Sequence, residues 1–176
     1  MPLYYKDVHY FTEFDIGLLL GMNGFLIFAI EMPLIKWLET TKFTKTGLIL
    51  FGAILTGLSF IILNMSSWTG VVIIGMLLMT FGEMIAFPFS NAFAMDRAKQ
   101  GNQGEYMALY SIAFSVAHIF GHKAGMSMVD NLGFNNTWYI ITILSALCVF
   151  LLFILKLYLK SKKQQKNIKE EEILWI

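Results

Sequence analysis

The sequence contains little charge, little proline and a single cysteine, and each shortage excludes a class of protein. Charged residues make up 14% of the 176 residues, whereas soluble domains carry about 25%. Hydrophobic residues reach 57%, which is too apolar for one soluble core. The lone cysteine, Cys148, excludes an intrachain disulfide framework. A net charge of +1 gives no sign of a nucleic-acid partner, and we predict none.

The usual motifs of soluble enzymes are also missing. No glycine-rich loop of the phosphate-binding kind and no Ser–His–Asp arrangement occurs in the sequence. Residues 1–15 lack a basic segment followed by an apolar one, so they do not read as a signal peptide. We therefore predict a protein that is not an enzyme and that uses no cofactor.

Long apolar runs dominate the chain instead. About 20 apolar residues in a helix cross the hydrocarbon layer of a membrane. The sequence predicts an all-α, polytopic membrane helical bundle over residues 16–160, with the lipid bilayer as its partner. Residues 1–15 would precede the first span on the outside, and residues 161–176 would form a charged cytoplasmic tail. The five predicted spans are about 16–35, 47–65, 70–95, 105–130 and 137–158.

Basic residues gather in alternate connectors, which predicts the orientation. The connectors 36–46 and 96–105, and the chain from Lys156 onward, hold nearly all of them, whereas the opposite set holds only Lys6. By the positive-inside rule the C-terminus is cytoplasmic and the N-terminus lies outside. We expect an integral protein of a bacterial inner membrane. An outside N-terminus without a signal peptide is uncommon, so we expect that earlier spans are missing.

Polar residues are shared unevenly among the spans. An ionisable group at membrane depth costs about 2.5–3.5 kcal/mol on insertion scales, and such groups normally face a bundle interior or a water-filled cavity. The second and fifth spans carry no ionisable group in their interiors. We therefore expect the first, third and fourth spans to line a cavity and the other two to lie outside them. The polar residues are Asn23, Glu31, Glu83, Asn91, His118, His122 and Lys123.

Small residues recur along two of the same spans. One side of the first span carries the small residues Gly17, Gly21 and Gly24. The fourth span carries a series of small residues, Ala113, Ala117, Gly121 and Gly125. Such faces allow close helix contact in membranes.

Three stretches resemble the C-terminal half of a major facilitator superfamily transporter, among them its proton-linked efflux members. They are 14–24 (FDIGLLLGMNG), 82–92 (GEMIAFPFSNA) and Arg97 followed by 104–110 (GEYMALY). The resemblance covers about residues 12–160 and implies that the spans are helices eight to twelve of such a protein. It implies helices eight, ten and eleven around a central cavity, nine and twelve at the periphery, and a missing N-terminal half as partner.

Two positions depart from that family pattern. The connector 33–46 is basic but lacks the Gly-x-x-x-Asp-Arg signature, and 121–123 reads Gly-His-Lys where many relatives carry Gly-Pro. The substrate is therefore not carried over with the resemblance.

Glu83 is the first candidate site residue, because a buried carboxylate can load and release a proton near neutral pH. The plain alternative is a structural, hydrogen-bonded glutamate. His118 and His122 share one helix face at a spacing of four. They read as a titrating or substrate-contacting pair, or alternatively as metal ligands with Glu83 as a third. Lys123 can pair with Glu83 or with a missing helix, or can extend outward along its own stem.

The remaining candidates lie inside the spans or near the cytoplasmic edge of the membrane. Asn23 and Asn91 can bind substrate or link helices by hydrogen bonds. Glu31 and Asp96 lie near the cytoplasmic edge. We expect them to pair with Lys36 and Arg97 or to help latch a gate.

These features favour part of a secondary transporter that couples export or import of a small molecule to protons by alternating access. A second hypothesis is a truncated membrane module without transport activity. A third is a metal-dependent membrane enzyme that uses His118 and His122.

Overall fold

The computed structural model describes residues 2–65, 68–98 and 102–174, and in these ranges it contains helices and no strand. The all-α helical bundle predicted from the sequence is confirmed. By length and apolarity four helices can cross a membrane. The elements are α1 Pro2–Asp7, α2 Glu13–Glu39, α3 Lys45–Met65, α4 Thr69–Arg97 and α5 Gln103–Leu174.

Helix α2 begins at a capping box. The Thr12 hydroxyl accepts a hydrogen bond from the Asp15 amide at 3.2 Å, and the Asp15 carboxylate accepts one from the Thr12 amide at 3.1 Å. These bonds satisfy backbone donors that a helix start leaves open. The helix continues through Pro33 to Glu39, so proline does not end it.

Helices α3 and α4 pack closely through residues with little or no side chain. A Cβ at Gly52 would lie 2.6 Å from the Gly82 carbonyl, and one at Gly75 would lie 2.8 Å from Leu63. Only glycine fits at these approaches, because a methyl group there would overlap the facing atoms. Leu63 and Val72 are fully buried in this interface.

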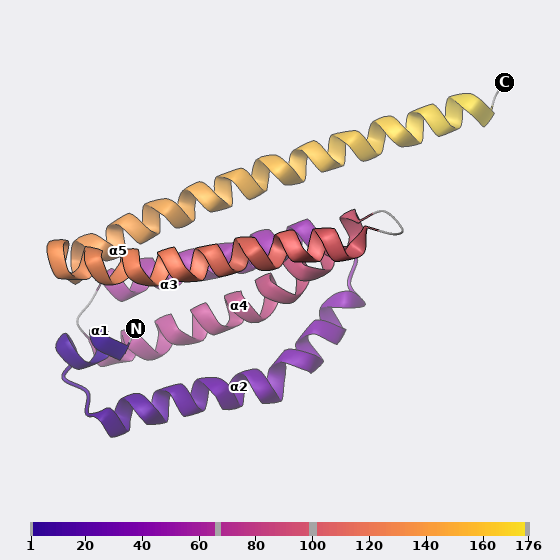
Figure 1. The fold of residues 1–176 in the computed structure, drawn as a ribbon. Coiled ribbons are helices and arrows are strands. Elements are labelled where there is room, and N and C mark those ends of the chain that lie inside the picture. The colour runs from indigo at the N-terminus through magenta and orange to yellow at the C-terminus, as the bar shows by residue number, and fades with distance from the viewer. Residues whose placement is uncertain (1, 66–67, 99–101, 175–176) are drawn as a thin grey trace.

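Helix α5 folds back on itself at Gly133. That residue has φ 75° and ψ 171°, a backbone conformation that glycine adopts without a steric cost. Figure 1 shows the two arms of α5 running back along the bundle from this turn. We call residues 103–132 the first arm and 134–174 the second arm. Residues 131–136, which separate the predicted spans 105–130 and 137–158, therefore form a turn within helical backbone.

Residues 161–176 were predicted to form a charged tail after the last span. The structure continues the second arm as helix through Leu174. The tail is rich in Lys, Gln and Glu, which are good helix formers, so the helix extends past the apolar run.

Helix α1 closes one end of the bundle with an aromatic cluster. The Tyr4 hydroxyl donates a hydrogen bond of 2.8 Å to the Leu63 carbonyl at the end of α3. The Tyr4 ring meets Trp138 edge-on with centroids 5.2 Å apart, and Tyr5 is also buried. The segment before the first span is thus folded against the helices rather than merely leading into them.

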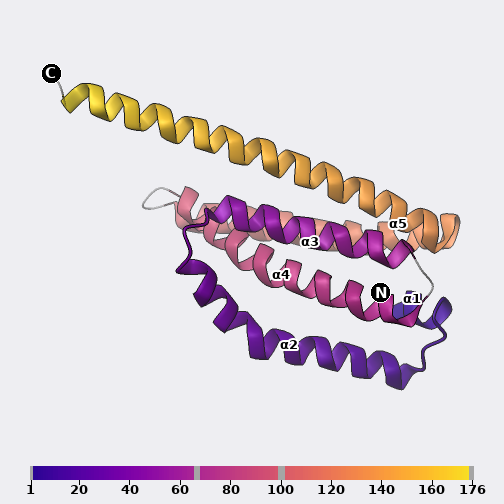
Figure 2. The same cartoon turned by 180° about the vertical axis from the view of Figure 1, so that it is seen from behind.

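The helices follow a definite spatial order. Helix α4 touches α2 on one side and the first arm of α5 on another, while α3 packs against α4 and against the second arm of α5. Figures 1 and 2 show α2 and the second arm at opposite edges. The three polar spans are therefore contiguous, with α4 between the other two.

Helix α3 was expected at the outside. It presents one exposed apolar stripe, and its remaining sides are covered by α4 and the second arm. It is therefore peripheral on one side only. The stripe consists of Phe51, Ile54, Leu58, Ile61 and Met65.

The two ends of the bundle differ in charge. The connection between α2 and α3, the end of α4 and the start of α5 lie together, opposite α1 and the Gly133 turn (Figure 2). The first of these ends carries Lys42, Lys45 and Arg97. The connectors in which the basic residues gather therefore lie at the same end of the bundle.

Candidate functional site

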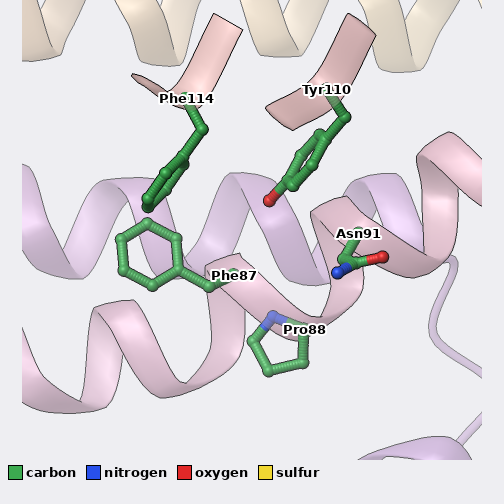
Figure 3. A pocket seen from close by; sticks show the side chains of 5 residues that line it. All are labelled: Phe87, Pro88, Asn91, Tyr110 and Phe114. Atoms are coloured by element: carbon green, nitrogen blue, oxygen red, sulfur yellow. The ribbon is translucent and has the colours of Figure 1, made fainter. Parts of the chain in front are cut away.

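The candidate site lies between α4 and the first arm of α5, where two pairs of side chains set the register. Ser90 Oγ and Tyr110 Oη lie 3.0 Å apart within hydrogen-bonding distance. The rings of Phe87 and Phe114 meet edge-on with centroids 5.7 Å apart. Figure 3 shows these aromatic side chains facing one another from the two helices. Because the helices run antiparallel, each turn back along α4 corresponds to one turn forward along α5.

A cavity of about 350 Å³ lies at this level, with Pro88 and Asn91 on its α4 side (Figure 3). Proline inside a helix has no amide hydrogen, so the carbonyl of Met84 lacks its usual partner there. The Asn91 amide and the Tyr110 hydroxyl are the polar groups that face the cavity. This arrangement offers hydrogen-bonding groups to a small polar solute in an otherwise aromatic chamber.

One turn further, the register brings Glu83 and His118 to the same level. Glu83 precedes Phe87 by one turn of α4, and His118 follows Phe114 by one turn of α5. The His118 ring already contacts Phe114, with centroids 4.9 Å apart. Glu83 is half-buried and His118 is exposed. Neither forms a hydrogen bond or ion pair with the residues that the structure describes.

A second cavity shows which residues of α4 and α5 lie opposite each other one turn beyond Glu83 and His118. Met79 and His122 both line a space of about 270 Å³ that also reaches Trp138 and Gly125. Met79 lies one turn before Glu83 on α4, and His122 lies one turn after His118 on α5. The level of Glu83 is therefore bracketed by a cavity on each side.

Asn23 joins the site to α2 as a structural link. The buried Thr80 hydroxyl donates to the Asn23 amide oxygen and also lies 2.7 Å from the Met76 carbonyl. This contact connects α2 to α4 through the Asn23 side chain.

The charges at the basic end do not pair as expected. Asp96 pairs with Lys45 of α3 at 2.6 Å, so the predicted Asp96–Arg97 pair is wrong. Neighbouring helix residues point to different sides, which separates these two side chains. The Arg97 guanidinium instead lies over the Phe93 ring, 4.8 Å from its centroid.

Two further predicted pairs do not form either. The described residues contain two ion pairs, Lys6–Glu13 and Lys45–Asp96. Glu31 is half-buried and forms no ion pair with Lys36. Lys123 is exposed and forms no ion pair with Glu83. In the part of the chain that the structure describes, no three His, Cys, Asp or Glu residues gather as metal ligands.

Comparison with known proteins decides the family. Residues 1–175, almost the whole chain, match the description Major Facilitator Superfamily. The chain belongs to the major facilitator superfamily.

Two relatives from this superfamily are named as transporters. Over 156 residues the chain is 26% identical to a Na(+), Li(+), K(+)/H(+) antiporter of Planococcus maritimus, covering 89% of this chain and 36% of the antiporter. Over 132 residues it is 24% identical to an uncharacterised MFS-type transporter, YqjV, of Bacillus subtilis strain 168, covering 74% and 31%. The chain thus spans about a third of the length of the relatives it matches. No solved structure matches.

Sequence reasoning missed part of the site of this superfamily member. Tyr110, Phe114 and Ser90 were not singled out, although Tyr110, Phe114, His118 and His122 recur every four residues. That recurrence places all four on one face of the helix. Extending the histidine pair backward along this face would have found the two aromatic residues.

Proposed function

We propose that this chain is the C-terminal part of a secondary transporter that moves a small solute by alternating access in exchange for protons. Glu83 is the proton-carrying carboxylate, and His118 faces it from the neighbouring helix. Helical spacing supports the proposal, because it puts Glu83 and His118 one turn from the Phe87–Phe114 contact and one turn from the cavity that Met79 and His122 line. A solute moving between the cavities passes both titratable groups.

The other polar residues have subordinate roles in this proposal. Asn91 and His122 contact solute from the two cavities, and Lys123 supplies a cation that faces a helix outside this chain. Asn23 holds α2 against α4 through Thr80. At the basic end, Asp96 with Lys45 forms a latch between α4 and α3, with Glu31 and Arg97 nearby on the same side of the membrane.

Monovalent cations are the first solutes to test. The relative from Planococcus maritimus is named for the exchange of Na(+), Li(+) and K(+) against protons. A carboxylate that alternately binds a proton and a cation is sufficient for such an exchange, because each ion neutralises the same buried charge. The reaction is transport rather than catalysis, and nothing covalent changes.

The partner of this chain is the N-terminal half of the same kind of protein, supplied by further chain or by a separate one. Open small-residue faces support this proposal. A Cβ added at Gly17, Gly21, Gly121 or Gly125 meets nothing within 4 Å. Their predicted close contacts are absent among the described helices, as expected for surfaces that a further helix covers.

The basic end supports an orientation with the C-terminus in the cytoplasm of a bacterium and the N-terminus outside the inner membrane. Lys42, Lys45 and Arg97 lie at that end, whereas the end with α1 carries Lys6. Basic residues near the ends of spans are retained on the cytoplasmic side.

The test measures the full product of the reading frame in everted membrane vesicles loaded with a proton gradient. We expect addition of NaCl, LiCl or KCl to dissipate the gradient, and Glu83→Gln to abolish the effect. The control is Glu105→Gln, which removes the same charge from an exposed first-turn position of α5. A Glu83→Gln protein that exchanges ions as well as the control would exclude the coupling role. Residues 1–176 alone should exchange nothing, because half of the cavity wall is missing.

A further inference from the structure

A separate cavity lies on the opposite side of α3, away from the candidate site. It occupies about 530 Å³ between the end of α2, the first half of α3 and the second arm of α5. This volume lies within the range of about 300–1,000 Å³ that small-molecule sites occupy. Its lining is apolar and aromatic apart from one cation and one hydroxyl, and includes Trp37, Phe43, Thr44, Phe51, Ile54 and Lys156.

The cavity is polar at one end and apolar at the other. The Lys156 ammonium lies beside Gly47, where an added Cβ would be 3.5 Å from Nζ and 3.0 Å from the Thr44 hydroxyl. From Gly47 to Ile54 the helix rises about 10 Å toward the middle of α3. Phe51 and Ile54 are exposed on the apolar stripe at the deep end. A ligand that fits this gradient has a charged head and an apolar chain.

The charge at the polar end is positive and uncompensated. Lys156 is half-buried and forms no ion pair with the residues that the structure describes. Lys45, at the start of α3, is engaged by Asp96 at 2.6 Å, and no carboxylate is among the described residues that line the cavity. Lys160 follows one turn further along the second arm. An anionic head group therefore meets Lys156 without competition from an acidic side chain.

The cavity lies at the basic end of the bundle, near the expected boundary between lipid head groups and lipid tails. Trp37 and Phe43 are exposed at its rim, where α2 and α3 meet at the basic end of the bundle. Aromatic residues at the ends of spans mark the boundary between lipid tails and head groups. The cavity thus opens into one leaflet of the bilayer, at the depth where a phospholipid changes from phosphate to acyl chain.

We propose that this cavity binds an anionic phospholipid of the surrounding bilayer. The phosphate lies at the Lys156 ammonium, and an acyl chain lies between Trp37, Phe51 and Ile54. Basic pockets between membrane helices bind anionic head groups in this way, and each Lys near the surface contributes about 1 kcal/mol toward anionic lipid. The lipid holds the second arm against α3 at the end where the two helices leave the membrane.

Native mass spectrometry of the purified chain tests the site. The protein is titrated with phosphatidylglycerol and, separately, with phosphatidylcholine carrying the same acyl chains. We expect preferential retention of phosphatidylglycerol, and we expect Lys156→Gln to weaken it about fivefold, to the level of phosphatidylcholine. Lys162→Gln is the matched control, because it removes the same charge from an exposed position on the same arm outside the cavity.

A second variant tests the apolar end without changing the charge. Ile54→Trp fills the deep part of the cavity, and we expect it to lower phosphatidylglycerol retention while circular dichroism stays unchanged. Equal retention of the two lipids by the wild-type protein would overturn the proposal. So would equal effects of Lys156→Gln and Lys162→Gln, or a lipid-free dimer that Ile54→Trp dissociates, since the occupant would then be a second copy of the chain.

Discussion

The two faces of α4 are built in opposite ways. Toward α3 the contact is close, with Gly82 against Gly52 and Thr56, and the ion pair Lys45–Asp96 lies at one end of it. Toward the first arm of α5 the contact is open, and it holds Glu83, two cavities and the exposed His118. The same helix is therefore tightly packed on one side and bordered by cavities on the other. Tight packing stabilises the contact with α3, whereas the looser contact with α5 leaves space between the helices.

The largest expected effect comes from adding a methyl group at the close contact. In Gly82→Ala the new Cβ would lie 2.8 Å from the Gly52 carbonyl and closer still to the Thr56 hydroxyl. Overpacking of this kind costs about 1–3 kcal/mol, because backbone atoms must move apart. We expect a lower midpoint of thermal unfolding in detergent.

Gly21→Ala is the matched control for that change. It adds the same methyl group to α2, where nothing lies within 4 Å of the new Cβ. Alanine favours helix over glycine by about 0.8–1.0 kcal/mol, so the midpoint should hold or rise. Equal losses from the two variants would contradict the contrast between close and open faces.

The open side of α4 is tested by replacing His118, the residue that faces Glu83 in the proposed function. His118→Gln leaves an exposed side chain of similar polarity, so we expect the free energy of unfolding to stay within about 0.5 kcal/mol of wild type. If His118 tunes the proton affinity of Glu83, the pH optimum of ion exchange shifts although the protein remains folded. The measurement is the exchange rate in vesicles against pH, with Glu105→Gln again as the control.

A smaller effect is expected at the cluster that closes the bundle. Tyr4→Phe keeps the ring but removes the hydrogen bond of 2.8 Å to the Leu63 carbonyl. A bond of this kind contributes about 0.5–1.5 kcal/mol, and an unpaired buried carbonyl adds to the loss. Tyr10→Phe removes a hydroxyl from a side chain that is 87% exposed and should change nothing. Identical melting curves for wild type and Tyr4→Phe would show that α1 contributes nothing to closure.

The smallest effect is a pH dependence of the same cluster. Burial lowers the pKa of His9 below its usual value. The folded protein therefore binds the proton less readily than the unfolded chain. The contribution of His9 to stability is complete above the unfolded pKa, near 6.5, and is lost as the pH falls through the lower, folded value. Hydrogen exchange at the α1 amides should accelerate on acidification, and His9→Gln should remove that part of the change.

Much of the fold follows from the sequence because burial in lipid and the length of a span are simple constraints. The apolar runs at 47–65 and 70–95 lie within α3 and α4. The family was identified from short stretches around Glu83 and Arg97, and the match over residues 1–175 confirms it.

The details that sequence reasoning missed depend on three-dimensional neighbours. Polarity placed Asp96 near the basic end, but only the packing of α3 against α4 selects Lys45 as its partner. Hydropathy separated the spans 105–130 and 137–158, but it did not show that one glycine with a positive φ joins their helices. The small residues around Gly121 predicted a close helix contact, but among the described residues no atom lies within 4 Å of a Cβ added there.

The turn at Gly133 has a mechanical consequence. The first arm of α5 forms the wall opposite Glu83, and the second arm forms a side of the cavity that holds Lys156. Because Gly133 joins the two arms without an intervening loop, a change in the tilt of the first arm reorients the second arm as well. In the proposed function, movement of the helix beside Glu83 is therefore coupled mechanically to the flank that carries Lys156.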